Sequence, residues 1–451
     1  MTAVIHLPEA RWEPHRSSNH HHGILLVRLR VPRAPPGDLL IEGFGAVLPL
    51  VLWFEVAAQA PSPAAQPAPE APRLKLSGEV AFRAEYIANE LFAESDAFRS
   101  DDSRFRERVR LRVGGDFQAT KTLTLSFRLS TGDPAFPPSA VVSFGNEMRR
   151  LPIQIDRAFV GVKPGGGLEL RFGIQPNPIF TPAEMTWDND VQPAGTSQTW
   201  QIGHRGFALS AGQFVLREIR SLRPSNEEGS LLFAEGLTYA RTGERGKVTA
   251  GVSHYYYNNP DSVALALQTG ELAADLKTNR YDPLGRTSPS PSDSGKRVPI
   301  DFFSGFSILE SGFRLEQPKR KLSLVGEVAW NLEARHNPSL GAAYRDRKNL
   351  AFLLMFRYGR VDKPWDFLAG VGYSEIPSDA ILAVYNSDDL QQTNVRCVPV
   401  DLQLRLPGPM RLVWDTYFQK KLDPAAPTTS GIVSPENAMR IRTRITLIAA
   451  F

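Results

Sequence analysis

The chain has 451 residues, of which 42% are apolar and 22% are charged, so it is long enough to form a large folded unit. No stretch approaches the roughly 20 consecutive apolar residues that a transmembrane helix requires, which excludes a helical membrane protein. The formal net charge is only +4 and the basic residues are spread along the chain, so nothing points to nucleic acid as a partner. The single cysteine, Cys397, cannot form an internal disulfide, and no Cys/His cluster has metal-ligand spacing, so we predict no metal and no other cofactor.

The N-terminal region predicts export through a signal peptide. Residues 43–58 hold a short apolar core, Phe44 to Phe54, followed by Val56-Ala57-Ala58, and we predict cleavage after Ala58 by signal peptidase. The alternative is a buried helix of a soluble domain. Residues 1–42 are interpreted as an upstream extension from a start placed too early, and the histidines there are assigned no function. Residues 59–72 are rich in alanine and proline, which favours an extended periplasmic spacer.

The region from Arg73 to Phe451 predicts strands and no helix. Its short segments alternate apolar and polar residues with period two, the signature of strands with one polar and one apolar face. In Arg104 to Val113 every even position is arginine, and the odd positions are apolar except Glu107. The segment at 122–129 repeats this alternation, and we predict the turn between the two at Gly114 to Lys121.

The connections between these segments favour a membrane barrel over a soluble β-sandwich. Short turn-like links alternate with long polar stretches, which is typical of outer-membrane barrels and unusual in a compact soluble domain. The long stretches are 89–103, 131–152, 176–201, 258–299 and 423–437. We therefore predict an all-β fold, a transmembrane antiparallel β-barrel of about 16 strands over residues 73–451, with short periplasmic turns and long extracellular loops.

The last segment predicts a closing strand that carries an assembly signal. From 439 to 451 the odd positions are mainly apolar, whereas Arg440, Arg442 and Arg444 occupy even positions. The segment ends on Phe451, and a last strand that ends in an aromatic residue resembles the signal that outer-membrane barrels present to their insertion machinery. We therefore expect the barrel-insertion machinery among the partners.

The sequence resembles the bacterial putative porin family over the first third of the predicted barrel. The resemblance rests on Arg104 to Arg112 (RFRERVRLR), Arg128 to Asp133 (RLSTGD), Asp156 to Val160 (DRAFV) and Gly173 to Gly195 (GIQPNPIFTPAEMTWDNDVQPAG). It implies a sixteen-stranded, trimeric porin of the Gram-negative outer membrane, surrounded by lipids and lipopolysaccharide. The later segments match the family in rhythm rather than in wording, and family membership alone does not identify a solute.

The alternation places arginine side chains inside the predicted barrel. An arginine on the lipid face costs about 2–4 kcal/mol near the bilayer midplane, so the polar faces are expected to line a water-filled lumen. The last strand is expected to close against the first, which brings the two arginine runs together in one basic wall. Most acidic residues are expected to lie in the loops. These arginines either select ions through their field or merely solvate the wall and pair with acidic neighbours. The predicted pore-lining residues are Arg104, Arg106, Arg108, Arg110, Arg112, Arg128, Arg440, Arg442 and Arg444.

The stretch Pro176 to Gln201 is the third long loop by our count, and in porins this loop commonly folds into the lumen. Its Glu184, Asp188 and Asp190 are predicted to oppose the arginines and to form a constriction. The spacing of Asp188 and Asp190 also raises calcium binding, but the local sequence lacks the remaining ligands of a loop site.

These patterns together predict a water-filled channel for passive diffusion of small hydrophilic solutes, with a mild preference for anions. Two alternatives remain, a closed structural barrel that anchors the envelope and an outer-membrane hydrolase. The sequence has no Gly-x-Ser-x-Gly elbow, and His254 sits on a predicted strand whose alternation points it outward. We therefore do not predict an enzyme.

Overall fold

The computed structural model describes residues 73–89, 103–144, 150–203, 205–218, 229–244, 246–269, 271–272, 279–289, 295, 297–390, 393–423 and 439–451. The predicted upstream extension, the signal peptide with its cleavage after Ala58, and the spacer at 59–72 lie outside the described residues. So do residues 90–102 and 424–438, which make up most of two predicted loops.

Seventeen strands of the described chain form one antiparallel sheet. The first nine are β1 (Arg73–Ala88), β2 (Arg104–Gln118), β3 (Leu123–Thr131), β4 (Val142–Ser143), β5 (Ile153–Gly165), β6 (Leu168–Ile174), β7 (Ala194–Ile202), β8 (Phe207–Arg217) and β9 (Ser230–Gly243). The others are β10 (Gly246–Asn258), β13 (Phe306–Gln317), β14 (Leu322–Asn331), β15 (Leu350–Gly359), β16 (Phe367–Ile376), β17 (Val395–Arg405), β18 (Met410–Lys421) and β19 (Arg440–Ala450).

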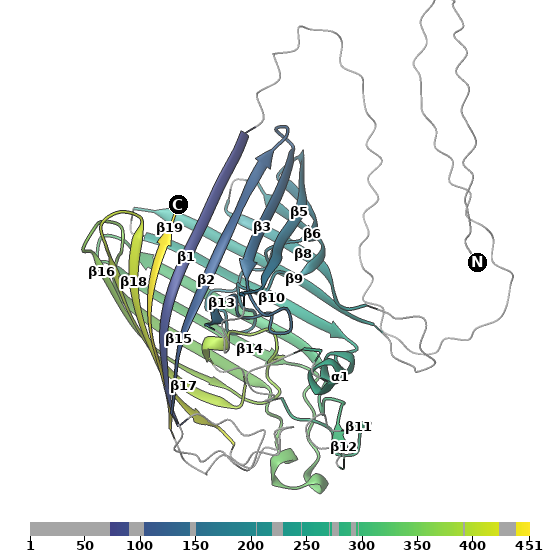
Figure 1. Ribbon diagram of the computed structural model, residues 1–451. Helices are drawn as coiled ribbons and strands as arrows, with labels where there is room; N and C mark the ends of the chain where they lie inside the picture. The colour runs from purple at the N-terminus through teal and green to yellow at the C-terminus, as the bar shows by residue number, and fades with distance from the viewer. Residues whose placement is uncertain are drawn as a thin grey trace, which may run out of the picture. The chain divides into compact units, whose positions relative to one another are not determined.

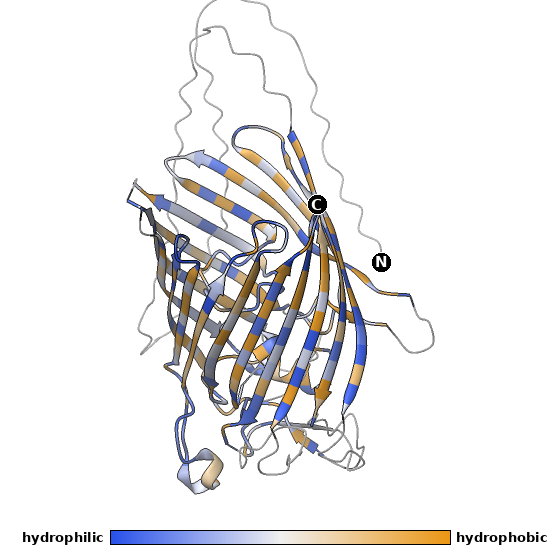
Figure 2. Ribbon diagram, turned by 90° about the vertical axis from the view of Figure 1, so that its left-hand side faces the viewer, coloured by the Kyte–Doolittle hydropathy of each residue, from blue (hydrophilic) through white to orange (hydrophobic). Residues whose placement is uncertain are grey.

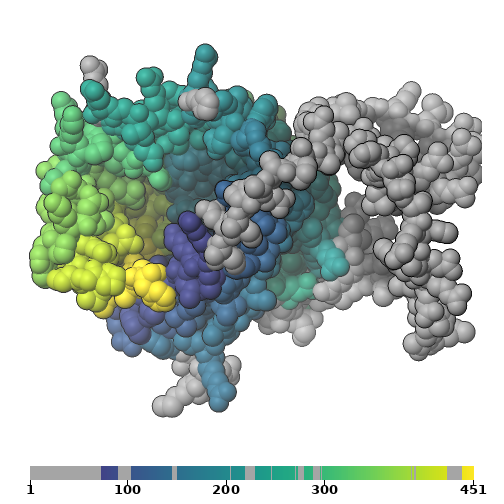
Figure 3. All heavy atoms as spheres, turned by 90° about the horizontal axis from the view of Figure 1, so that it is seen from above, coloured from purple at the N-terminus to yellow at the C-terminus, as the bar shows by residue number. Residues whose placement is uncertain are grey.

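The sheet closes into a barrel of sixteen strands (Figure 1), which confirms the predicted fold class. β4 is a two-residue strand paired with β2, and the other strands pair in sequence order until β19 returns to β1. Figure 3 shows the two ends of this order, purple β1 and yellow β19, side by side. At this seam Phe451 and Gly78 exchange two backbone hydrogen bonds of 3.0 Å. Closure satisfies the backbone groups for which a bilayer offers no partner.

The barrel has an apolar outer surface because its strands alternate as the sequence predicts. On β2, Phe105, Leu111 and Val113 are exposed, whereas Arg108 between them is buried. The bands of alternating hydropathy along the strands are visible in Figure 2. His254 has the same parity as the exposed Val252 on β10, so it belongs to the outward face as expected. The predicted alternation of short links with long stretches is confirmed, with short turns after β5, β9, β13, β15 and β17.

Two predicted boundaries are wrong. β2 continues through Gly114 and Gly115 to Gln118, and the turn follows at 119–122. A Cβ atom on Gly114 would lie 2.4 Å from the carbonyl oxygen of Phe127, so this glycine serves the close approach of β3 rather than a turn. Residues 194–201, predicted as loop, belong to β7, whose many small and polar residues hide its strand character.

The expectation of no helix is also wrong. The described loops contain α1 (Asp261–Thr269), the 3-10 helices η2 (Pro338–Leu340), η3 (Ala342–Tyr344) and η4 (Asp388–Leu390), and the hairpin of β11 (Thr287–Pro289) and β12 (Arg297–Pro299). These elements are too short to show a helical period in the sequence. None of the described helices is long and apolar enough to cross a membrane.

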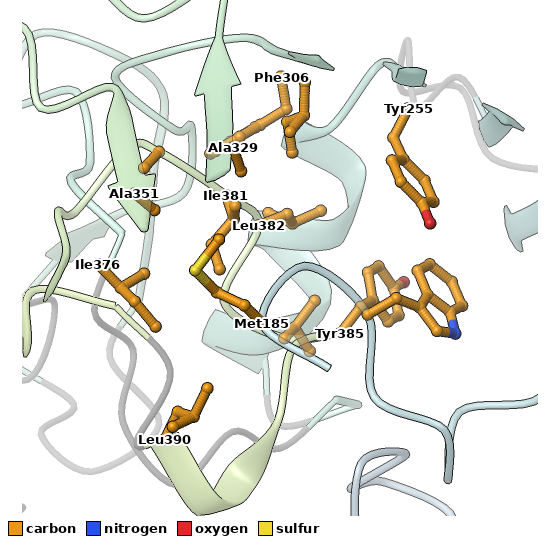
Figure 4. Close-up of a cluster of buried hydrophobic side chains, with 14 of the residues drawn as sticks. Met185, Tyr255, Phe306, Ala329, Ala351, Ile376, Ile381, Leu382, Tyr385 and Leu390 are labelled. Atoms are coloured by element: carbon orange, nitrogen blue, oxygen red, sulfur yellow. The ribbon is translucent and has the colours of Figure 1, made fainter. Parts of the chain in front are cut away.

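Two loop segments fill part of the barrel interior near the end of the barrel that carries the long loops, which we call the loop end. We call residues 175–193 the β6–β7 segment and residues 377–390 the β16–β17 segment. Met185 of the first and Ile381 of the second are fully buried, in one apolar cluster with Tyr255 and Phe306 of the barrel wall (Figure 4). The wall side of this cluster comes from β8 to β10 and β13 to β18. The loop end of the barrel is therefore packed on one side.

Candidate functional site

The arginines of β2 and β19 flank β1 at the loop end of the barrel. β1 pairs with both strands, and its Glu85 lies opposite Arg106 on β2 and Arg444 on β19. This confirms the predicted arrangement of the two arginine runs on either side of the first strand. We call the following residues the arginine wall: Arg106, Arg108, Arg110 and Arg112 of β2 with Arg440, Arg442 and Arg444 of β19.

The centre of the arginine wall is one buried carboxylate shared by three guanidinium groups. Glu85 is fully buried and forms an ion pair with Arg106. Arg108 and Arg442 contact the same carboxylate at 3.5 Å and 2.9 Å. Such partners are required, because a buried carboxylate that loses its only partner costs several kcal/mol. Among the described residues, three positive charges therefore surround one negative charge at the centre of the wall.

The two sides of the arginine wall meet carboxylates from the infolded segments. Arg112 forms an ion pair of 2.6 Å with Asp190 of the β6–β7 segment. Arg444 pairs with Asp389 of the β16–β17 segment and, at 3.1 Å, with Asp415 of β18. Each infolded segment therefore places one aspartate against the wall.

The wall also contains strand carboxylates, so the expectation that acidic residues lie mainly in loops is wrong here. Glu79 of β1 pairs with Arg110 at 2.5 Å, and Glu85 and Asp415 are strand residues as well. Their polar side chains alternate with apolar ones just as the arginines do, so alternation alone did not distinguish an all-basic face from a mixed one.

Two other predicted pore-lining residues, Arg104 and Arg128, lie beside the arginine wall. Arg104 is the exposed first residue of β2. Arg128 lies on β3 and pairs with Asp156 of β5. Within the wall, Arg440 donates a hydrogen bond of 2.8 Å to Oε1 of Gln419.

The β6–β7 segment crosses the interior from β13 and β14 to β2. On the far side, the carboxylate of Glu327 accepts hydrogen bonds from the backbone N–H groups of Ala183 at 2.8 Å and Thr186 at 3.0 Å. Arg314 of β13 donates to the Pro182 carbonyl at 2.7 Å. On the near side Asp190 reaches the arginine wall. The segment is thus held at both ends by charge-assisted hydrogen bonds.

The three acidic residues predicted in this segment have different surroundings. Burial raises the pKa of Glu184, whose carboxylate accepts a hydrogen bond of 2.6 Å from Asn189, and nearby Asp389 and Asp190 raise it further. Burial alone would raise the pKa of Asp190, but Arg112 and Arg110 outweigh it, so this pKa is lowered.

Asp188 is buried and accepts a hydrogen bond of 2.7 Å from the backbone N–H of Asp190. Oδ1 of Asp190 is already engaged by Arg112. These contacts occupy oxygens that a calcium ion would need. Within the described ranges no group of three or more His, Cys, Asp or Glu side chains could hold a metal ion.

Sequence reasoning missed the β16–β17 segment altogether. Its backbone meets the other segment directly, since Asp188 N–H donates to the Tyr385 carbonyl at 2.8 Å and Ser387 N–H donates to the Glu184 carbonyl at 3.2 Å. The ring of Tyr385 stacks on Trp187 with centroids 5.4 Å apart. The signal that could have found it is Ala380 to Val384, five consecutive apolar residues between two strands, where a solvated loop would be polar.

Comparisons with known proteins match one family. The model of the family described as putative porin matches residues 88–400. No curated protein matches the sequence. Among solved structures, an anion-selective porin from Comamonas acidovorans is 12% identical with a TM-score of 0.47, covering 84% of this chain and 100% of its own. A Salmonella typhi OmpF in complex with daunomycin is 11% identical with a TM-score of 0.47, covering 84% of this chain and 97% of its own.

Proposed function

The chain belongs to the putative porin family and forms a channel barrel of the bacterial outer membrane, and on this premise we propose that it passes small hydrophilic solutes by passive diffusion with a mild preference for anions. The observation that carries the preference is Glu85, one buried carboxylate among three guanidinium groups. Screening limits the reach of this field to about 8 Å at physiological salt, so the preference should be modest. Family membership favours a channel over the hydrolase alternative.

The solute path should run along the arginine wall, because the opposite side of the lumen at the loop end is packed with apolar side chains. The side chains of Arg106 and Arg110 are each 15% exposed, and that of Arg112 is 14% exposed. Those of Arg442 and Arg444 are only 1% and 2% exposed. The three β2 arginines are therefore proposed to line the path, with the β19 arginines adding charge from behind. Arg104, Arg128 and Arg440 are proposed at its margins, and the β6–β7 segment as its constriction.

A closed structural barrel is the second candidate, and the near-complete burial of Arg442 and Arg444 favours it. Reversal potentials in planar bilayers under a salt gradient separate the candidates. We expect discrete open-channel current steps and a reversal potential whose sign shows a preference for anions. This preference should decrease as the salt concentration rises. Barrels that insert without conductance would support the closed candidate. A conducting, cation-preferring pore would overturn the anion preference while leaving the channel in place.

Three features of the sequence are proposed on sequence grounds alone. The mature protein is proposed to begin near Gln59, after the signal peptide. Phe451 is proposed to act as the signal for the barrel-insertion machinery, and three copies are proposed to associate in the outer membrane. Sequencing of the mature N-terminus, assembly of a chain without Phe451, and the mass of the native complex test these points one by one.

A further inference from the structure

The β16–β17 segment lies inside the barrel as firmly as the β6–β7 segment does. Asn279 donates hydrogen bonds to the carbonyls of Ser378 at 2.5 Å and Ile381 at 2.8 Å. Asn331 of β14 donates to the Asp379 carbonyl at 2.7 Å. Its apolar residues 380–384 are almost fully buried, in the cluster that Figure 4 shows around Ile381 and Leu382. A segment with this many internal anchors does not depend on the Asp389–Arg444 ion pair for its position.

Asp389 lies near the end of this segment. It forms an ion pair with the arginine wall and is also partly exposed to solvent. Its carboxylate pairs with Arg444, with one contact at 2.9 Å, and Tyr417 donates to it at 3.3 Å. The Asp389 side chain is 33% exposed, whereas that of Arg444 is 2% exposed. Burial alone would raise the pKa of Asp389, but Arg444 lowers it well below its usual range, so the carboxylate stays ionised.

We propose that the β16–β17 segment is a second constriction element, and that Asp389 is a selectivity-determining residue through which it reduces the anion preference of the channel. This inference rests on the proposed function. The physical reason is the uneven charge along the wall. Glu85 has three arginine partners, whereas Arg444 has two carboxylate partners, Asp389 and Asp415. The partly exposed Asp389 is therefore the negative charge that passing ions meet at the β19 side of the wall.

The test replaces Asp389 by asparagine, which keeps the shape and removes the charge. Arg444 retains Asp415, and Gln419 still finds the residue-389 carbonyl, to which it donates at 3.2 Å. In the channel's salt-gradient assay the ratio of anion to cation permeability should rise about twofold, because salt screens the field of one unit charge within about 8 Å at physiological ionic strength. The matched control is Asp362→Asn. Asp362 is 69% exposed in the turn between β15 and β16, far along the strands from the wall, and should leave the ratio unchanged.

A second variant keeps the test valid if Asp389→Asn fails to fold, because its charge is changed only after the barrel has assembled. Asp389→Cys is assembled first and then modified with a cationic or an anionic thiol reagent, with the parent as control because its Cys397 is buried. The cationic adduct should raise the anion preference, and the anionic adduct should return it to the value of the parent channel. Equal reversal potentials for the two adducts, or for Asp389→Asn and the parent, would overturn the inference. A parent that conducts and prefers anions would still support the proposed function in that case. A non-conducting parent would overturn both.

Discussion

The two sides of the barrel interior hold the same infolded segments by different means. Toward β8 to β18, apolar side chains such as Met185, Phe306 and Ile381 pack with almost no exposure. Toward β19, β1 and β2, the contacts are ion pairs between arginines and carboxylates, including Asp190 and Asp389. Apolar packing, together with buried polar contacts such as those of Glu327 and Arg280, fixes the position of the segments. The ion pairs of the arginine wall fix the charge that faces the lumen. Changes on the packed side should therefore alter stability, and changes on the charged side should alter selectivity.

On the packed side, the largest loss of stability is expected from replacing Arg280. This side chain is buried between the loops, pairs with Asp379 at 2.8 Å, and lies over the rings of Phe303 and Tyr344. Arg280→Ala would leave the buried Asp379 carboxylate without its cation, a loss of about 3–5 kcal/mol for a buried pair. We expect the loops to become sensitive to limited proteolysis while the heat-modifiable barrel persists.

The matched control for this prediction is Arg297→Ala. Arg297 is exposed, and its contacts are hydrogen bonds to Thr287 at 2.8 Å and 2.9 Å. Exposed contacts of this kind contribute at most about 1 kcal/mol. Equal protease sensitivity of the two variants would contradict the assignment of Arg280 as the anchor of the loops.

The second largest effect is expected at a pair of glutamates on the packed side. Glu327 accepts two backbone hydrogen bonds from the β6–β7 segment, whereas neighbouring Glu310 is buried with no hydrogen-bond partner for its carboxylate oxygens within the described chain. Glu327→Gln retains one acceptor oxygen and should weaken the docking of the segment by about 1.5–3 kcal/mol, the size of one hydrogen bond to a charged group. Glu310→Gln removes an unpartnered buried acid and should be neutral or stabilising.

Open-channel noise and thermal unfolding of the two variants provide the measurement. Glu327→Gln should raise the noise and lower the unfolding temperature, and Glu310→Gln should do neither. The opposite order would show that Glu327 does not hold the segment.

A smaller effect, on selectivity alone, is expected from pH. Burial raises the pKa of Glu184 above its ordinary value of 4.5, while the pKa values of Asp190 and Asp389 are lowered. As pH falls below neutral, Glu184 is therefore the first of the three to take up a proton. An ionised carboxyl with a raised pKa destabilises the docked segment. Docking therefore gains stability as pH falls and Glu184 takes up its proton, and loses it as pH rises.

The lost negative charge should make the parent more anion-preferring in mild acid. Reversal potentials at neutral pH and in mild acid measure this shift. Glu184→Gln should show no such step, and a step of the same size in that variant would assign the titration to another group.

The sequence predicted the wall of the barrel better than its contents. Strand alternation is a local property, so the strand number, the short turns and the arrangement of Arg106 to Arg112 beside β1 followed from the pattern. The contents depend on contacts between segments distant in sequence. Nothing near Asp389 indicates that Arg444 lies beside it, and Gly114 resembles a turn until the approach of β3 is known. The partners of Glu85 likewise come from both β2 and β19.

The most direct test of the account is the reversal potential of the triple variant Arg106→Ser, Arg108→Ser, Arg110→Ser in a salt gradient. Glu85 keeps Arg442 as a partner at 2.9 Å, so the buried carboxylate is not left alone and the barrel should still assemble. Three positive charges disappear from the wall, and the account predicts a shift of the reversal potential toward cations that is largest at low salt. A triple variant that assembles normally and keeps the ion preference of the parent would show that the arginines only solvate the wall, and would contradict the central claim.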